Sequence, residues 1–185
     1  MLDHVYTRRR SIVAAFGASA AVALAGTGPV PLADAHAASC SGAKANINKA
    51  SASKLRSALL CLVNNKRASA GLKAIKANRK LEKAATRHAK DMVKRDYFAH
   101  QRPGGPNLGE RLERAGWSGS AFGETIAYGC GSSASPKATL RGWLNSPPHR
   151  AILLSATYKA GGLGVGAEAP CGNHGATWVL DVGRR

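Results

Sequence analysis

The chain has 185 residues, of which 44% are hydrophobic, and 27 lysines and arginines against 10 acidic residues give it a formal net charge of +17. This length suits one domain with its own core and leaves no room for several large ones. The charge favours anionic partners, but aromatic residues make up only 5% of the chain and no known nucleic-acid motif accompanies the charge. We therefore expect no nucleic-acid partner. Anionic cell-wall polymers, or simply a well-solvated surface, explain the charge better.

The first 37 residues have the order of a secretion signal. Three arginines, Arg8–Arg10, precede an apolar run over residues 12–26 that contains no acid, and small residues follow it. A cleavage motif ends at Ala37, with an alternative at Ala35. The apolar run is too short for a membrane helix, which needs about 20 residues. The pattern predicts a signal peptide over 1–37, export by the general or the twin-arginine route, and a secreted protein that is not integral to the membrane.

Residues 38–52 are rich in Ala, Ser, Asn and Lys and predict a flexible lead-in to one domain over 53–185. Apolar residues at helical spacing predict one helix from Ser53 that stops at Gly71 and another from Asn78. Further along, the sequence predicts helices over 108–115, 136–144 and 148–154 and strands over 122–128, 163–167 and 177–182. Helices come first and strands lie mostly in the second half, which favours an α+β fold with helices on a small antiparallel sheet.

Four cysteines follow the signal: Cys40, Cys61, Cys130 and Cys171. An even number in an oxidising compartment indicates disulfides, for which three pairings are possible. We favour Cys40–Cys61 with Cys130–Cys171, because each pair ties neighbouring parts of the chain. A lipid on Cys40 is the alternative, but the bulky apolar residue usual before a lipidated cysteine is missing.

Three ionisable residues are candidates for a shared site. His100 precedes a Gly-Pro loop, and Glu124 lies on the predicted strand 122–128 among apolar neighbours, where a carboxylate needs a partner. His149 lies in the first turn of a predicted helix, whose N-terminus disfavours imidazolium and so favours a neutral ring. Each could also be structural, and His88, on the apolar stripe of its helix, is expected to be a core histidine.

A serine hydrolase built on Ser146, His149 and Glu124 is a weaker interpretation. Ser146 stands before a proline at a predicted helix start, where an N-cap explains its hydroxyl better. The chain also has no G-x-S-x-G nucleophile elbow.

Five segments in order resemble one family: Leu60-Cys61-Leu62-Val63-Asn64, Phe98-Ala99-His100, Gly123-Glu124-Thr125-Ile126-Ala127, Trp143-Leu144-Asn145-Ser146-Pro147-Pro148-His149-Arg150-Ala151-Ile152-Leu153 and Gly164-Val165-Gly166. Together they resemble the bacterial secreted branch of the CAP superfamily (the SCP domain), named for cysteine-rich secretory proteins, antigen 5 and pathogenesis-related 1 proteins. The resemblance covers roughly residues 55–183. It implies a three-layer α-β-α sandwich with a small central antiparallel sheet and an open cleft.

The resemblance also carries a set of cleft residues onto this chain. Two histidines and acidic residues line the cleft in the family, and the matching motifs place His100, Glu124 and His149 there. Many members have a second glutamate where this sequence has Asn145 or Ser146, so the acidic set is incomplete. Two neutral histidines and one carboxylate still suit Zn²⁺ with an open position, although the missing acid weakens that expectation.

Three functions follow from these observations. We favour a non-catalytic, monomeric binding module for a lipid or small ligand, with a basic surface for anionic cell-wall polymers. The alternative is a zinc hydrolase in which His100 and His149 hold the metal beside Glu124. In a third interpretation Glu124 and the two histidines form a hydrogen-bonded network that only stiffens the cleft.

Overall fold

The computed structural model describes residues 39–169 and 171–185; the predicted signal peptide, including Ala37, lies outside them. The elements are α1 (Ala52–Ser69), β1 (Lys76–Ala77), α2 (Arg79–Lys94), α3 (Leu108–Arg114), β2 (Ala121–Cys130), the 3-10 helix η1 (Gly131–Ala134), α4 (Pro136–Asn145), α5 (Pro147–Leu153), β3 (Ala160–Ala169) and β4 (Gly172–Arg184). All the predicted helices and strands are present, and the sequence did not indicate β1 and η1. No helix in these residues is long and apolar enough to cross a membrane.

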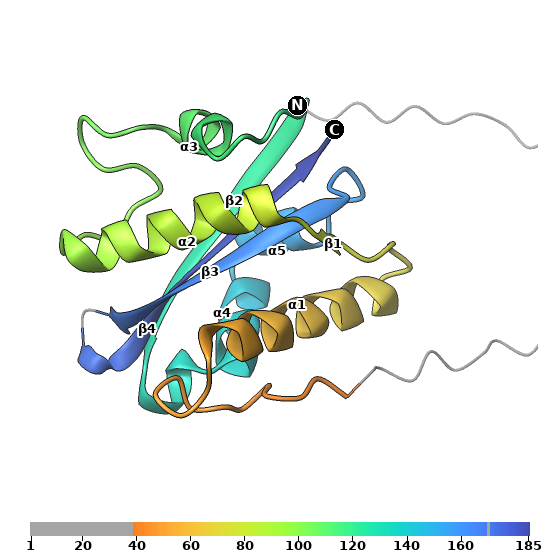
Figure 1. Ribbon diagram of the computed structural model, residues 1–185. Coiled ribbons are helices and arrows are strands. Elements are labelled where there is room, and N and C mark those ends of the chain that lie inside the picture. The colour runs from red at the N-terminus through yellow and green to blue at the C-terminus, as the bar shows by residue number, and fades with distance from the viewer. Residues whose placement is uncertain (1–38, 170) are drawn as a thin grey trace, which may run out of the picture. The chain divides into compact units, whose positions relative to one another are not determined.

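The strands form one sheet in the order β1-β3-β4-β2. The long strands β3, β4 and β2 are antiparallel, whereas the short edge strand β1 runs parallel to β3. Helices α2 and α3 cover one face of the sheet and α1, α4 and α5 cover the other (Figure 1). The structure confirms the predicted α+β sandwich, with one short parallel strand added at the edge of the antiparallel sheet.

Polar side chains at the helix starts explain where the helices begin. The Ser51 side chain accepts a hydrogen bond from the Lys54 amide at the start of α1, and the Asn78 side chain accepts from the Lys80 and Leu81 amides at the start of α2. Ser135 caps α4 ahead of Pro136, as predicted. Ser146 takes the cap position of α5, but its side chain makes no capping hydrogen bond. The prediction of α5 was therefore right in place, whereas the role given to the Ser146 hydroxyl was wrong.

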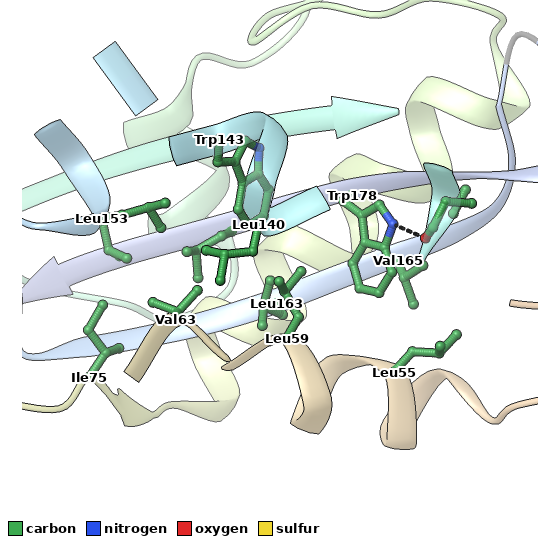
Figure 2. Close-up of a cluster of buried hydrophobic side chains, with 14 residues drawn as sticks. Leu55, Leu59, Val63, Ile75, Leu140, Trp143, Leu153, Leu163, Val165 and Trp178 are labelled. Atoms are coloured by element: carbon green, nitrogen blue, oxygen red, sulfur yellow. Dashed lines mark hydrogen bonds between the residues drawn. The ribbon is translucent and has the colours of Figure 1, made fainter. Parts of the chain in front are cut away.

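The face under α1, α4 and α5 is a large apolar core (Figure 2). Leu59 on α1 and two tryptophans, Trp143 and Trp178, are fully buried there. Each indole has a hydrogen-bond acceptor: Trp143 Nε1 donates to Ile126 O and Trp178 Nε1 donates to Ala134 O, both at 3.0 Å. The bonds let these large rings be buried without an unsatisfied N–H.

One charged side chain is buried at the edge of this core. Arg67 in the last turn of α1 has no exposed surface and donates to four backbone carbonyls. They belong to Lys73 (3.0 Å), Leu153 (2.6 Å), Ser155 (2.9 Å) and Tyr158 (3.3 Å). Because α5 ends at Leu153, this arginine satisfies the end of that helix and holds it against α1.

The favoured disulfide pairing is confirmed. Cys40–Cys61 joins the segment before α1 to that helix, and Cys130–Cys171 joins the end of β2 to the turn between β3 and β4. Half-buried Ala45, Ile47 and Ala50, in the segment expected as a lead-in, pack against the apolar core.

The other face of the sheet lets α2 approach closely. A Cβ atom at Gly164 of β3 would lie 2.2 Å from the Ala85 carbonyl oxygen on α2, and one at Gly162 would lie 1.9 Å from the Glu82 nitrogen. Only glycine fits at these two positions, because the backbones of strand and helix are in contact. This approach brings His88, on the inner side of α2, next to the strands.

Candidate functional site

Glu124 is the centre of a buried polar cluster on the α2 face. It lies on β2, its side chain is 2% exposed, and Asp181 on β4 is its partner in the strand register. His100 Nδ1 donates to Glu124 Oε1 at 2.7 Å, and Arg111 Nη2 donates to Glu124 Oε2 at 2.5 Å. Burial alone would raise the pKa of Glu124, but the His100 hydrogen bond and the Arg111 charge outweigh it and lower the pKa. The group is therefore a carboxylate held from both sides.

Arg111 connects this carboxylate to the loop between α2 and α3. It comes from the first turns of α3, whose start is fixed by the Asn107–Glu110 capping box. Its Nη1 donates to His100 O at 2.7 Å and to Pro106 O at 3.3 Å. One guanidinium therefore positions both Glu124 and the backbone of the histidine that binds it.

His88 closes the cluster from α2. Its Nε2 donates to Ala99 O at 3.1 Å and lies 3.9 Å from Glu124 Oε2. Burial lowers the pKa of His88, and the nearby Glu124 charge only partly opposes this effect. The prediction of a core histidine is correct in that the ring is buried, but the ring also belongs to the polar cluster.

Asp181 is a second carboxyl group beside Glu124. It is completely buried, and burial, together with the Glu124 charge, raises its pKa well above the ordinary value. As a carboxylate it would have no hydrogen-bond donor at either oxygen among the described residues. As a neutral acid it can donate its proton to Glu124. The two groups form an acid–carboxylate pair that shares one negative charge.

His149 and Ser146 lie at the start of α5, and both are half-buried. Burial lowers the pKa of His149, and the charge of His100 lowers it further, so the two imidazoles lie within electrostatic range of each other. The pKa shift has the predicted direction, although its causes are burial and His100 rather than the helix end. In the part of the chain that the structure describes, no hydrogen bond joins Ser146 to His149 or Glu124.

The arrangement does not fit the zinc site considered above. The structure brings His100 and Glu124 together, but the Glu124 oxygens accept from His100 and from a guanidinium, whose charge opposes a cation there. Among residues 39–169 and 171–185, no three His, Cys, Asp or Glu side chains form a group that could hold a metal ion. A ligand can instead contact the His100 ring, which is 56% exposed. Its Nδ1 binds Glu124, and its Nε2 takes no part in that bond.

Arg111 and Asp181 are cluster residues that the sequence analysis missed. Asp181 could have been found, because it is an acid between Leu180 and Val182 on a predicted strand, the argument that singled out Glu124. Arg111 gave no such signal, since it is one of many basic residues and lies on a short helix with charged neighbours.

A groove between α1 and α4 is a second candidate site. It has a volume of about 560 Å³, within the range of small-molecule sites. Leu62, Leu140 and Leu144 form its apolar part. Four basic side chains and no acidic one border it: Lys44, Lys66, Lys137 and Arg141. We call this site the α1–α4 groove.

Comparison with known proteins identifies one family and two curated relatives. The Cysteine-rich secretory protein family (CAP) matches residues 60–182. The uncharacterized membrane protein YlbC of Bacillus subtilis (strain 168) is 34% identical over 107 residues, which are 58% of this chain and 30% of that protein. The uncharacterized protein YkwD of the same strain is 31% identical over 103 residues, or 56% of this chain and 39% of that protein. The matched region thus spans well under half of either relative.

Solved structures support the same assignment. An extracellular protein containing a SCP domain from Bacillus anthracis aligns with a TM-score of 0.60 and 29% identity, over 74% of this chain and 44% of that one. An outer surface protein of Borrelia burgdorferi shares the fold, with a TM-score of 0.61 and 20% identity over 69% of this chain and 90% of that one. With the family match over most of the described domain, these findings show that the chain belongs to the CAP family of cysteine-rich secretory proteins.

Proposed function

We propose that this CAP domain is a secreted, non-catalytic binding module whose ligand is a lipid with an acidic head group. The α1–α4 groove carries the proposal, because it combines three leucines with four basic side chains. An acyl chain would lie on Leu62, Leu140 and Leu144, and transfer of its methylene groups from water supplies the affinity.

The basic border of the groove selects the head group. Lys66 and Lys137 are exposed and lie where a carboxylate or phosphate could reach them without being buried. Such pairs contribute modest energy individually, but four like charges with no acid among them reject cationic head groups. A neutral ester of the same chain should therefore bind more weakly than the acid.

The His–Glu cluster supports a binding role rather than catalysis. Its carboxylate is held by Arg111 and His100, and its second acid, Asp181, is completely buried. These contacts fix β2, the loop before α3 and α3 relative to one another. We propose that the cluster keeps the cleft rigid while His100 and His149 contact what binds there.

Export is part of the proposal. Two disulfides persist in oxidising compartments and are rare in the cytosol. The Bacillus anthracis structure is of an extracellular protein. Outside the cell, the net charge of +17 would also hold the protein near anionic cell-wall polymers, an attraction that added salt should weaken.

Titration calorimetry with palmitate and methyl palmitate tests the groove. We expect palmitate to bind more tightly than its ester. Lys66→Gln combined with Lys137→Gln should weaken palmitate binding about 5- to 10-fold, and Ala138→Phe should fill the groove and abolish it. Lys90→Gln combined with Lys94→Gln removes two exposed charges from α2 and should change the affinity less than about 2-fold.

Two results would contradict the proposal. Protein that retains neither palmitate nor its ester has no lipid groove. If Lys90→Gln/Lys94→Gln weakens binding as much as the groove variants, the fatty acid responds to net charge and not to this site.

A further inference from the structure

A second cavity lies on the opposite side of the sheet from the α1–α4 groove. It has a volume of about 300 Å³ and is enclosed by α2, α3 and the loop that joins them. Four arginines from all three segments line it: Arg87 on α2, Arg102 in the loop, and Arg111 and Arg114 on α3. We call it the arginine cavity. Arg111 and Arg114 stand three residues apart, which places both on one side of their helix.

The positive charge of this cavity is only partly compensated, because Arg111 is paired with Glu124 but the other three arginines share one aspartate. Asp91 is its single acidic lining residue, and that carboxylate already binds Arg95 and Tyr97, both at 2.8 Å, with Arg102 at 4.0 Å. Burial and the hydrogen bond to Asp91 raise the pKa of Tyr97 to about 12, so the phenol adds no negative charge. Arg87 and Arg114 have no carboxylate within 4.0 Å in the described part of the chain.

Buried donors in the cavity wall have no acceptor. The Arg111 side chain is 9% exposed, and although its terminal nitrogens bind Glu124 and two carbonyls, its buried Nε has no hydrogen-bond partner among the described residues. Arg102 Nε is also buried without one. A buried donor without an acceptor is unfavourable, so an anion that draws these two guanidinium groups towards it and accepts from them would offset a penalty that the free protein carries.

We propose that the arginine cavity binds the phosphate group of an organic phosphate monoester. Guanidinium groups match phosphate oxygens through paired hydrogen bonds, and a monoester carries about −1.5 to −2 charges at pH 7. That charge suits a cavity in which Arg111 is paired with Glu124 but Arg87 and Arg114 have no carboxylate partner among the described residues better than a single carboxylate does. The cavity exceeds a bare phosphate in size, which leaves room for a small organic group such as glycerol.

This site is independent of the lipid groove. None of its lining residues lines the α1–α4 groove, and different helices form the walls of the two sites. The net charge of +17 could attract phosphate anywhere on the surface, so the test must separate the cavity from general attraction.

Titration calorimetry of protein produced from the full chain, with glycerol 1-phosphate as the probe, tests the proposal. Glycerol and sodium sulfate serve as the uncharged and the inorganic comparisons. Arg87→Gln combined with Arg114→Gln removes two exposed cavity arginines and should weaken glycerol 1-phosphate binding about 10-fold or more. Arg79→Gln combined with Lys83→Gln removes two exposed charges from α2 outside the cavity and should change it less than about 2-fold.

Vesicles containing 20% phosphatidic acid in phosphatidylcholine distinguish a free phosphate ester from a lipid head group. Binding of glycerol 1-phosphate, of these vesicles, or of both, with loss in the cavity variant alone, supports phosphate recognition and identifies its source. The proposal is overturned if neither binds, if sulfate binds as tightly as the ester, or if both double variants lose affinity equally. Lys66→Gln/Lys137→Gln should leave glycerol 1-phosphate binding unchanged, so the lipid groove can fail without this site failing.

Discussion

The two faces of the sheet use the same strands but bury different chemistry. On β4, Trp178, Leu180 and Val182 belong to the apolar core under α1, α4 and α5, whereas Val179 and Asp181 face α2. The α1 side is filled by large side chains. On the α2 side the helix lies very close to the sheet, because Gly162 and Gly164 allow its backbone to contact β3.

This difference places most of the apolar packing on one face of the sheet and the buried polar cluster on the other. Most of the large apolar side chains are buried on the α1 side. Close approach on the α2 side places His88 Nε2 3.9 Å from Glu124, and Arg111 on α3 donates to the same carboxylate at 2.5 Å. Substitutions on the α2 side should therefore affect the position of the polar cluster as well as stability.

Gly164→Ala should have the largest effect. Its Cβ would lie 2.2 Å from the Ala85 carbonyl oxygen, so α2 must move off the sheet, at a cost of about 3 kcal/mol. Gly142→Ala on α4 is the matched control, because its Cβ meets nothing within 4 Å. It should stabilise the protein by up to about 1 kcal/mol through helix propensity. Urea unfolding measures both changes, and a loss below about 1 kcal/mol at Gly164 would show that α2 tolerates displacement.

Glu124→Gln should cost about 1–3 kcal/mol at pH 7, because the buried Arg111 loses its carboxylate. The pKa of Glu124 is lowered in the folded protein. Its contribution is therefore present above the unfolded value of about 4.3 and is lost as pH falls through the folded pKa. Urea unfolding should show a wild-type advantage at pH 7 that shrinks in acid. An advantage that is constant with pH would mean that the charge contributes nothing.

Asp181→Asn should change the pH dependence of stability in the opposite direction from Glu124→Gln, although the two carboxyl groups are cross-strand partners. Burial raises the pKa of Asp181, so its favourable contribution is complete below the unfolded value of about 3.9 and declines as pH rises towards the folded pKa. Asparagine keeps a donor for Glu124 and does not titrate. We expect a small effect at pH 4 and a relative gain at pH 8, measured in the same urea series. A loss at pH 8 as large as that of Glu124→Gln would show that Asp181 is ionised and needed as such.

Local patterns were sufficient to predict most of the fold. Ser135-Pro136 and Asn78 mark helix starts through hydrogen bonds within a few residues, and the stripe on α2 follows from helical spacing. β1 was missed because two residues paired in parallel with β3 leave no periodic pattern. The zinc site was predicted from residue types, without knowledge that Arg111 would lie against Glu124.

Arg67, at the edge of the apolar core, shows why contacts between distant parts of the chain could not be predicted. Arg67 binds the carbonyls of Leu153, Ser155 and Tyr158, more than 80 residues away, and in sequence it resembles any basic residue near a helix end. The sequence indicates that an acid on a strand needs a partner, but the fold decides which arginine or histidine it is.

The smallest expected effect is a pKa change at the edge of the cleft. Burial lowers the pKa of His149, and the charge of His100 lowers it further. His100→Gln removes the second cause only, so the His149 titration midpoint, followed by NMR, should rise yet stay below the roughly 6.5 of a free histidine. His174→Gln, an exposed change on β4, should leave it unchanged. If His100→Gln also leaves the midpoint unchanged, the two histidines do not share a cleft. A full return to about 6.5 would instead show that His149 is less buried than the structure has it, and that α5 lies farther from the polar cluster.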